Sequence, residues 1–195
     1  MKKHLFLTGP SGCGKTFLIR KVLGDKAAFA GGFVTERITD TDGSLLGYDL
    51  FPAAHAASYG DIDGKRFLDY TQSPPLHDNS VFREYAASLL NESLYYPFIM
   101  LDEIGGYEIL IPQFREQLSA VLCSDVPCIG VLKGQINAEE LKNSLGLGDK
   151  FPAMLTQLRS FMENDEDTLL YEFTDRGDRE VEALISQWVN EYADI

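Results

Sequence analysis

The sequence predicts an α/β fold of three layers, with a mostly parallel central sheet and an inserted antiparallel β-hairpin. Short apolar runs typical of buried strands alternate along the chain with segments whose apolar residues recur at helical spacing. A glycine-rich turn joins the first such run to the first helical segment. The 195 residues contain no internal repeat or long linker, so we expect one domain, 1–195.

The predicted strands differ in pattern according to their place in the sheet. Buried strands are expected where the runs are wholly apolar or nearly so: 4–8, 98–101, 128–132 and 169–173. Residues 32–38 alternate instead, and 45–51 run back after the turn at 40–43, which predicts the hairpin. Between 52 and 79 the pattern weakens, and we expect irregular structure with short strands.

The predicted helices are segments with one apolar face. Gly24 ends the first helix, Asn79 or Ser80 caps the second, and Asn137 with Glu140 resembles a capping box. The C-terminal helix carries the clearest apolar stripe. The predicted helices span 16–23, 80–90, 114–122, 137–145, 151–162 and 181–192.

Composition excludes several classes of protein. Hydrophobic residues make up 45% and charged residues 24%, as in globular proteins. No segment approaches the roughly 20 apolar residues that cross a bilayer, and the apolar run after the basic N-terminus is too short for a signal peptide. We therefore expect a cytoplasmic protein without membrane contact. The net charge of −13 argues against nucleic-acid binding, and the spacing of the three cysteines fits neither a disulfide framework nor a zinc site.

The segment 9–16 carries the strongest chemical signal. It follows a predicted strand, opens a predicted helix and fits G-x-x-x-x-G-K-[ST], the phosphate-binding P-loop. In such a loop the backbone N–H groups surround phosphate oxygens, the lysine contacts the β- and γ-phosphates, and the threonine hydroxyl binds Mg²⁺. The predicted nucleotide-binding residues are Gly9, Pro10, Ser11, Gly12, Cys13, Gly14, Lys15 and Thr16.

Two acids follow the predicted strand 98–101. The carboxyl ends of strands are where open α/β sheets bind ligands, so Asp102 is expected to hold Mg²⁺ through a water, with the Thr16 hydroxyl as another ligand. Glu103 is the expected general base for an attacking water, and Lys15 and Glu103 are the predicted catalytic residues. The sequence therefore predicts Mg²⁺-dependent hydrolysis of nucleoside triphosphates such as ATP and GTP to the diphosphate and phosphate.

Two other functions remain open: phosphotransfer to a nucleotide or other small molecule, and a switch or binding module that uses nucleotide only for its shape. Hydrolysis is favoured because the expected lid region, 133–161, has no pair of arginines to exclude water. Lys133 and Gln135 follow the strand 128–132 and are candidate phosphate sensors, with exposed loop residues as the alternative. No arginine finger can be assigned, and a surface role is favoured for each candidate: Arg37, Arg66, Arg83, Arg115 and Arg159.

These motifs together resemble a family, the small P-loop nucleoside-triphosphatases of the thermophile and cancer-related type. The resemblance is carried by 9–16, 32–37 with 47–50, 98–105 with Glu108, and 130–132. It implies a RecA-like fold of the additional-glutamate class and slow hydrolysis of nucleoside triphosphates with little base selectivity. It also places Lys15 and Thr16 on phosphate and Mg²⁺, Asp102 on Mg²⁺ and Glu103 on the water. The chain departs from the family pattern at 67–70 and at Gly106, which leaves open a regulatory or substrate-transferring descendant.

Overall fold

A computed structural model describes residues 1–57, 63–175 and 178–193. In this part of the chain one eight-stranded sheet has the order β5-β4-β3-β2-β6-β7-β1-β8. Strands β2, β6, β7, β1 and β8 run parallel, whereas β3, β4 and β5 add antiparallel pairs at one side. The strands are β1 (His4–Thr8), β2 (Ala30–Thr39), β3 (Leu45–Pro52), β4 (Lys65–Asp69), β5 (Leu76–His77), β6 (Phe98–Ile104), β7 (Cys128–Leu132) and β8 (Thr168–Glu172).

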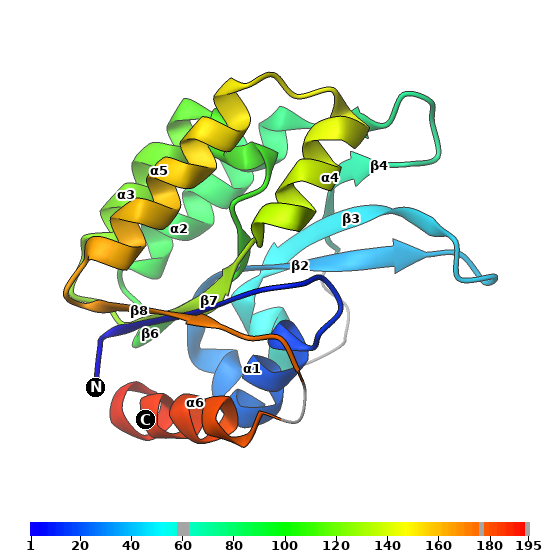
Figure 1. The fold of residues 1–195 in the computed structure, drawn as a ribbon. Coiled ribbons are helices and arrows are strands. Elements are labelled where there is room, and N and C mark those ends of the chain that lie inside the picture. The colour runs from blue at the N-terminus through cyan, green and yellow to red at the C-terminus, as the bar shows by residue number, and fades with distance from the viewer. Residues whose placement is uncertain (58–62, 176–177, 194–195) are drawn as a thin grey trace.

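Helices cover both faces of the sheet and so give three layers (Figure 1). Helices α2, α3, α4 and α5 lie above the sheet in this view, and α1 and α6 lie below it. The α-helices are α1 (Lys15–Leu23), α2 (Ala87–Ser93), α3 (Pro112–Leu122), α4 (Gln135–Leu145), α5 (Lys150–Asn164) and α6 (Arg179–Tyr192). Shorter helical segments are η1 (Gly24–Phe29), η2 (Ala53–Ala57), the π-helical η3 (Val81–Ala86) that leads into α2, and η4 (Tyr107–Leu110).

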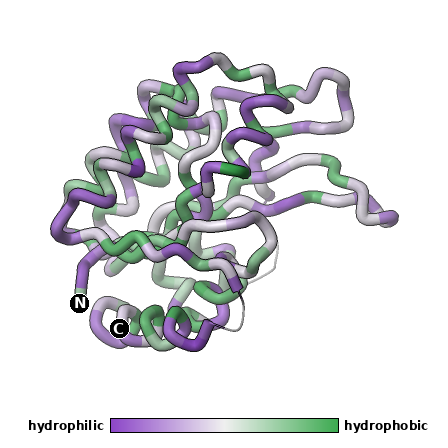
Figure 2. Tube along the Cα trace, viewed as in Figure 1, coloured by the Kyte–Doolittle hydropathy of each residue, from purple (hydrophilic) through white to green (hydrophobic). Residues whose placement is uncertain are grey.

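Each helical layer packs its own hydrophobic core against the sheet. The upper core joins Phe114 of α3 and Phe151 of α5 to the sheet residue Phe33. The lower core joins Ile19 of α1 and Trp188 of α6 to other sheet residues. Figure 2 shows hydrophobic residues along the central strands, while the tip of the β2–β3 hairpin is hydrophilic and extends beyond the layers. The central strands are therefore buried on both faces, which explains their uninterrupted apolar sequences.

The predicted fold class is confirmed, and the differences are local. The hairpin forms as predicted, β4 and β5 are the short strands expected within 52–79, and β6 continues to Ile104. The carboxylate of Asp78 accepts hydrogen bonds from the N–H and hydroxyl of Ser80, so neither Asn79 nor Ser80 supplies the side-chain cap predicted there. No helix among the described residues is long and apolar enough to cross a membrane.

The predicted capping box at Asn137 is also wrong. Helix α4 begins two residues earlier, at Gln135, with Gly134 in the N-cap position and no side-chain cap. An asparagine in the first turn of a helix is free to use its side chain elsewhere, and Asn137 uses it on the segment 9–16, as described below.

Candidate active site

The backbone of the predicted P-loop, residues 9–16, depends on glycine at both ends. Gly9 has φ +135°, and a Cβ atom there would lie 2.1 Å from the carbonyl oxygen of Phe173. Gly14, with φ +107°, precedes α1 in a left-handed conformation that glycine adopts without strain. No side chain caps the first turn of α1, and that turn holds no acid, so its N–H groups and its positive dipole end suit an anion.

Lys15 lies inside this loop. Its ammonium group is buried and donates hydrogen bonds to the carbonyl oxygens of Gly9, at 3.0 Å, and Pro10, at 2.6 Å. Cys13 is half-buried, and its thiol faces the carbonyl oxygen of Phe173 at 3.5 Å. Of the predicted loop residues, Gly9, Pro10 and Cys13 do not line the cleft described below, whereas Ser11, Gly12, Gly14, Lys15 and Thr16 do.

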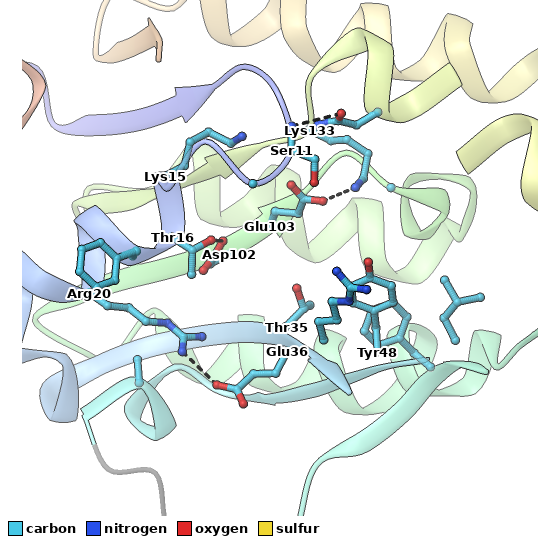
Figure 3. Close-up of a pocket in the computed structure, with 18 of the residues that line it drawn as sticks. Ser11, Lys15, Thr16, Arg20, Thr35, Glu36, Tyr48, Asp102, Glu103 and Lys133 are labelled. Atoms are coloured by element: carbon cyan, nitrogen blue, oxygen red, sulfur yellow. Dashed lines mark hydrogen bonds and ion pairs between the residues drawn. The ribbon is translucent and has the colours of Figure 1, made fainter. Parts of the chain in front are cut away.

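The side chains of Thr16, on α1, and Asp102, on β6, are in contact. The Thr16 hydroxyl donates a hydrogen bond of 2.9 Å to Oδ1 of Asp102, which lies on β6 between β2 and β7 (Figure 3). Asp102 is buried, and burial raises its pKa to about 7, although the charge of Arg20 and the Thr16 hydrogen bond act in the opposite direction. The charged form of this carboxylate is therefore costly unless a cation compensates it.

The same pair fits the requirements of a magnesium ion. Oδ2 of Asp102 is buried without a hydrogen-bond partner among the described residues, and a threonine hydroxyl oxygen lies beside it. Mg²⁺ prefers oxygen ligands, keeps several waters and uses substrate phosphates, so it does not need a cage of protein acids. In the described part of the chain, no group of three or more His, Cys, Asp or Glu side chains is placed to hold a metal ion.

Glu103, next to Asp102, is held by a half-buried lysine. Lys133, which directly follows β7, donates a hydrogen bond and forms an ion pair with Oε1 of Glu103. Burial alone would lower the pKa of Lys133, but the charge of Glu103 and this hydrogen bond raise it, so the lysine stays charged. The ion pair fixes the Glu103 carboxylate between the P-loop and the far wall of the cleft, as Figure 3 shows.

Glu108 supports the turn that follows β6. Its Oε1 accepts the N–H groups of Gly105 and Gly106, both at 2.7 Å. Burial raises the pKa of Glu108 to about 7, although these backbone hydrogen bonds and Lys133 oppose the shift. A Cβ atom on Gly106 would lie 2.5 Å from Oε2 of Glu108, which gives a physical reason for glycine at this departure from the family pattern.

A second ion pair lies on the other side of Asp102. Arg20 of α1 donates a hydrogen bond of 2.9 Å to Oε1 of Glu36 on β2, and Nε2 of His55 lies 3.7 Å from the same oxygen. The ring of His55 stacks on Phe51 with centroids 4.1 Å apart. Arg20 is one helical turn from Thr16, so both side chains lie on the same face of α1.

Asn137 attaches α4 to the P-loop. Its Oδ1 accepts the N–H of Ser11 at 3.3 Å, and its Nδ2 donates to the carbonyl oxygen of Gly9 at 3.4 Å. The two hydrogen bonds use the N–H of Ser11 and the carbonyl of Gly9, which belong to the same loop. Any movement of α4 therefore changes the hydrogen bonding of the segment expected to bind phosphate.

One cleft of about 1080 Å³ is lined by Lys15, Thr16, Arg20, Glu36, Asp102, Glu103, Glu108, Lys133 and Asn137. Arg37 and Lys133 are on its wall, whereas Gln135 is exposed and lies outside it. The other arginine candidates do not line it: Arg66 pairs with Asp49, Arg83 with Glu84, Arg115 bonds the Ile109 carbonyl, and Arg159 pairs with Glu163 and Glu172. The structure thus brings together Lys15, Thr16, Asp102, Glu103 and Lys133.

The comparisons with known proteins identify the family of the chain. A family model described as NTPase matches residues 4–150. The chain belongs to this NTPase family. Among curated NTPase relatives, the nucleoside-triphosphatase THEP1 of Thermococcus kodakarensis is 25% identical over 139 residues, which cover 68% of this chain and 77% of that protein. The nucleoside-triphosphatase THEP1 of Thermotoga sp. is 27% identical over 149 residues, or 71% of this chain and 80% of that protein.

A solved structure has the same fold as this NTPase. The crystal structure of THEP1 from the hyperthermophile Aquifex aeolicus matches with a TM-score of 0.64 at 19% identity, and the match covers 97% of this chain and 98% of that one. At this identity the likeness shows the fold alone. The family resemblance predicted from the sequence is confirmed, while the roles of the individual site residues stay predictions.

Among the charged and polar cleft residues, sequence reasoning missed Arg20, Glu36 and Asn137, for different reasons. Arg20 could have been found, because it lies four positions after Thr16 on the helix that the P-loop opens. Glu36 had a weaker signal, namely its place near the carboxyl end of a strand. Asn137 gave no signal, because its spacing to Glu140 fits a helix cap equally well.

Proposed function

We propose that this chain hydrolyses nucleoside triphosphates, ATP and GTP among them, to the diphosphate and phosphate with Mg²⁺ as cofactor. The observation that supports the proposal best is the contact between Thr16 and Asp102, with Glu103 next along the strand. A P-loop threonine and a strand-end aspartate form a metal site only when the two oxygens are adjacent, and here they are 2.9 Å apart.

Each residue then has a defined task. The N–H groups of the P-loop and the first turn of α1 bind the β-phosphate. Lys15 moves its ammonium group from the loop carbonyls to the β- and γ-oxygens, where its charge offsets the charge that develops on the leaving diphosphate. Thr16 and Asp102 are the residues that would hold the metal, and bound Mg²⁺ would neutralise phosphate charge.

Glu103 orients and deprotonates the attacking water. Its carboxylate is held on one oxygen by Lys133, so the second oxygen is available to a water molecule. The ion pair limits the rotation of the carboxylate, which is the kind of positioning that makes a general base effective. Lys133 acts through Glu103 and is in our proposal a positioning residue.

The decisive experiment measures phosphate release with ATP, GTP, CTP and UTP, each with and without Mg²⁺. We expect release to require Mg²⁺, to fall to background in Lys15→Ala, and to fall at least about 100-fold in Glu103→Gln. Glu103→Gln should still bind nucleotide, because the P-loop and Asp102 are intact. Glu116→Gln, which removes an exposed carboxylate on α3, is the matched control and should hydrolyse at the wild-type rate. Wild-type turnover in Glu103→Gln would reject the assignment of the base.

A further inference from the structure

The cleft extends beyond the groups that hydrolysis uses. Five aromatic side chains line its wall on the side of β3 and β4, and we call them the aromatic end: Tyr48, Phe67, Tyr70, Phe82 and Tyr107. Phe67, Phe82 and Tyr107 are buried and pack on one another, with the rings of Phe67 and Phe82 4.9 Å apart. Tyr48 and Tyr70 are only half-buried and stand edge to face, 6.4 Å apart. An attacking water molecule does not require aromatic contacts, so hydrolysis alone does not explain this part of the cleft.

The aromatic end lies on the side of the cleft from which a nucleophile would approach the γ-phosphate. In phosphoryl transfer the nucleophile and the leaving group lie roughly in line on opposite sides of the γ-phosphorus. The leaving diphosphate is expected in the P-loop, so the nucleophile must enter from the opposite side, past Glu103. Figure 3 shows Glu103 between Thr16 and Tyr48, with Lys133 reaching Glu103 from above, and the charges of Glu103 and Lys133 both act on the pKa of Tyr48.

The same reasoning separates the aromatic end from the base of the bound triphosphate. The base is attached beyond the α-phosphate, on the leaving-group side of the P-loop. The aromatic end lies on the nucleophile's side of the γ-phosphate. A second molecule, rather than the base of the triphosphate, therefore fits there.

The charges at this end favour a neutral ligand. Lys133 and Glu103 neutralise each other, and Glu108 is buried and bonded to two backbone N–H groups. Arg37 lies opposite Tyr48 in the β2–β3 hairpin and is the cation at this end, and Glu140 of α4 lines the same cleft with the opposite charge. Little net charge is left to bind a phosphate monoester, which carries close to two negative charges at neutral pH.

We propose that the aromatic end binds a nucleoside, whose hydroxyl group accepts the γ-phosphoryl group in competition with water. A flat heterocycle matches the rings of Tyr48 and Tyr70, and their phenol groups can hydrogen-bond to its polar edge. The hydroxyl oxygen forms the new bond to the γ-phosphorus as the bond to the β,γ-bridging oxygen breaks. The hydroxyl proton passes to Glu103, and the electron pair leaves with the diphosphate. This inference rests on the proposed function, because it uses the same triphosphate site.

The test follows label from ATP labelled at the γ-phosphate. The full chain is incubated with Mg²⁺ and with adenosine, guanosine, cytidine, uridine or thymidine, and the products are separated into inorganic phosphate and nucleoside monophosphate. We expect labelled monophosphate with at least one nucleoside. Phosphate release without any nucleoside measures the proposed hydrolysis separately. If that release fails as well, the triphosphate site is at fault; if it persists without transfer, only this inference is overturned.

Two variants connect transfer to the aromatic end. In Tyr48→Ala and Tyr70→Ala the ratio of labelled monophosphate to labelled phosphate should fall by about tenfold, because one stacking partner is lost. Tyr95→Ala removes an exposed tyrosine remote from the cleft and should leave the ratio unchanged. Tyr70→Leu keeps an apolar side chain at the same place, so it replaces Tyr70→Ala if circular dichroism shows that the alanine variant is not folded.

Binding supplies a readout that does not depend on turnover. Calorimetry with a non-hydrolysable ATP analogue already bound should detect the reacting nucleoside, with affinity about tenfold lower in Tyr70→Ala. Three outcomes would overturn the inference: labelled phosphate as the only product with every nucleoside, transfer to nucleoside monophosphates but not to nucleosides, and competition between the ATP analogue and the nucleoside. The last outcome would mean that the nucleoside shares the site of the triphosphate instead of occupying a second one.

Discussion

At the scale of single residues, the buried carboxylate of Asp102, which we propose as a metal ligand, lowers the stability of the chain when no cation is bound. Its pKa in the folded chain is about 7 because it is buried, against 3.8 for an exposed aspartate. Between these values the folded state binds more protons than the unfolded state, so this residue lowers the free energy of unfolding as pH rises through that window. Above pH 7 the full cost of the buried charge remains.

Asp102→Asn should therefore stabilise the chain at alkaline pH while abolishing hydrolysis. Without added metal or nucleotide, we expect a gain on the order of 2–4 kcal/mol at about pH 8, shrinking to near zero at about pH 4. Asparagine keeps an oxygen that can accept the Thr16 hydrogen bond, which isolates the effect of charge. Urea unfolding at several pH values measures the gain. An equal gain at both ends of the pH range would mean that packing, not charge, causes it.

Lys133 is the second residue with a testable role. Its ion pair holds Glu103, so Lys133→Ala should lower kcat by about 10- to 100-fold through loss of positioning, with a much smaller change in KM. Lys150→Ala, which removes an exposed lysine at the start of α5, is the control and should change neither constant. Steady-state phosphate release separates the two constants. A rise in KM with unchanged kcat would instead assign Lys133 to binding of the triphosphate.

At the scale of elements, helix α4 is joined to the P-loop through Asn137. Asn137→Asp keeps the size of the side chain but puts a negative charge within hydrogen-bond distance of the loop expected to bind phosphate. We expect nucleotide affinity to fall by about tenfold, because the carboxylate repels the phosphates and cannot donate to the Gly9 carbonyl, and to fall by less in Asn137→Ala, which loses both hydrogen bonds but adds no charge. Asn143→Asp places the same charge on an exposed position of α4 and should have little effect. Equilibrium binding of a labelled nucleotide distinguishes them.

Whether a part of the site could be predicted from the sequence depends on how many elements contribute to it. The P-loop and its helix are local: the glycines, Lys15 and Thr16 follow one another, so their arrangement is encoded within eight residues. Asp102 was predictable one step less directly, because the ends of parallel strands meet at one edge of a sheet. The contact of Asn137 with Ser11 joins positions 126 residues apart, and no local pattern distinguishes it from a helix cap. The aromatic end was not predictable either, because its residues come from separate segments and 67–70 departs from the family pattern.

At the scale of the whole molecule, two hydrophobic cores share one sheet. The upper core contains Phe114 and the lower core contains Trp188, the single tryptophan of the chain. The strands between them are buried on both faces. Loss of either core therefore exposes one apolar face of the strands on which the other core packs. This arrangement favours cooperative unfolding, although the assignment of 1–195 to one domain stays a prediction.

Unfolding of the two cores can be followed separately, because Trp188 fluorescence reports the lower core and circular dichroism reports all helices. We expect the two urea transitions to coincide in the unmodified chain. Phe114→Ala leaves a cavity in the upper core only, and should lower the free energy of unfolding by about 3–5 kcal/mol. If the sheet couples the cores, the fluorescence midpoint falls by the same amount as the dichroism midpoint, although Phe114 belongs to the opposite layer. Tyr95→Ala, at an exposed position, should move neither midpoint. A fluorescence midpoint that does not move in Phe114→Ala would show that the layers unfold independently and that the single-domain prediction is wrong.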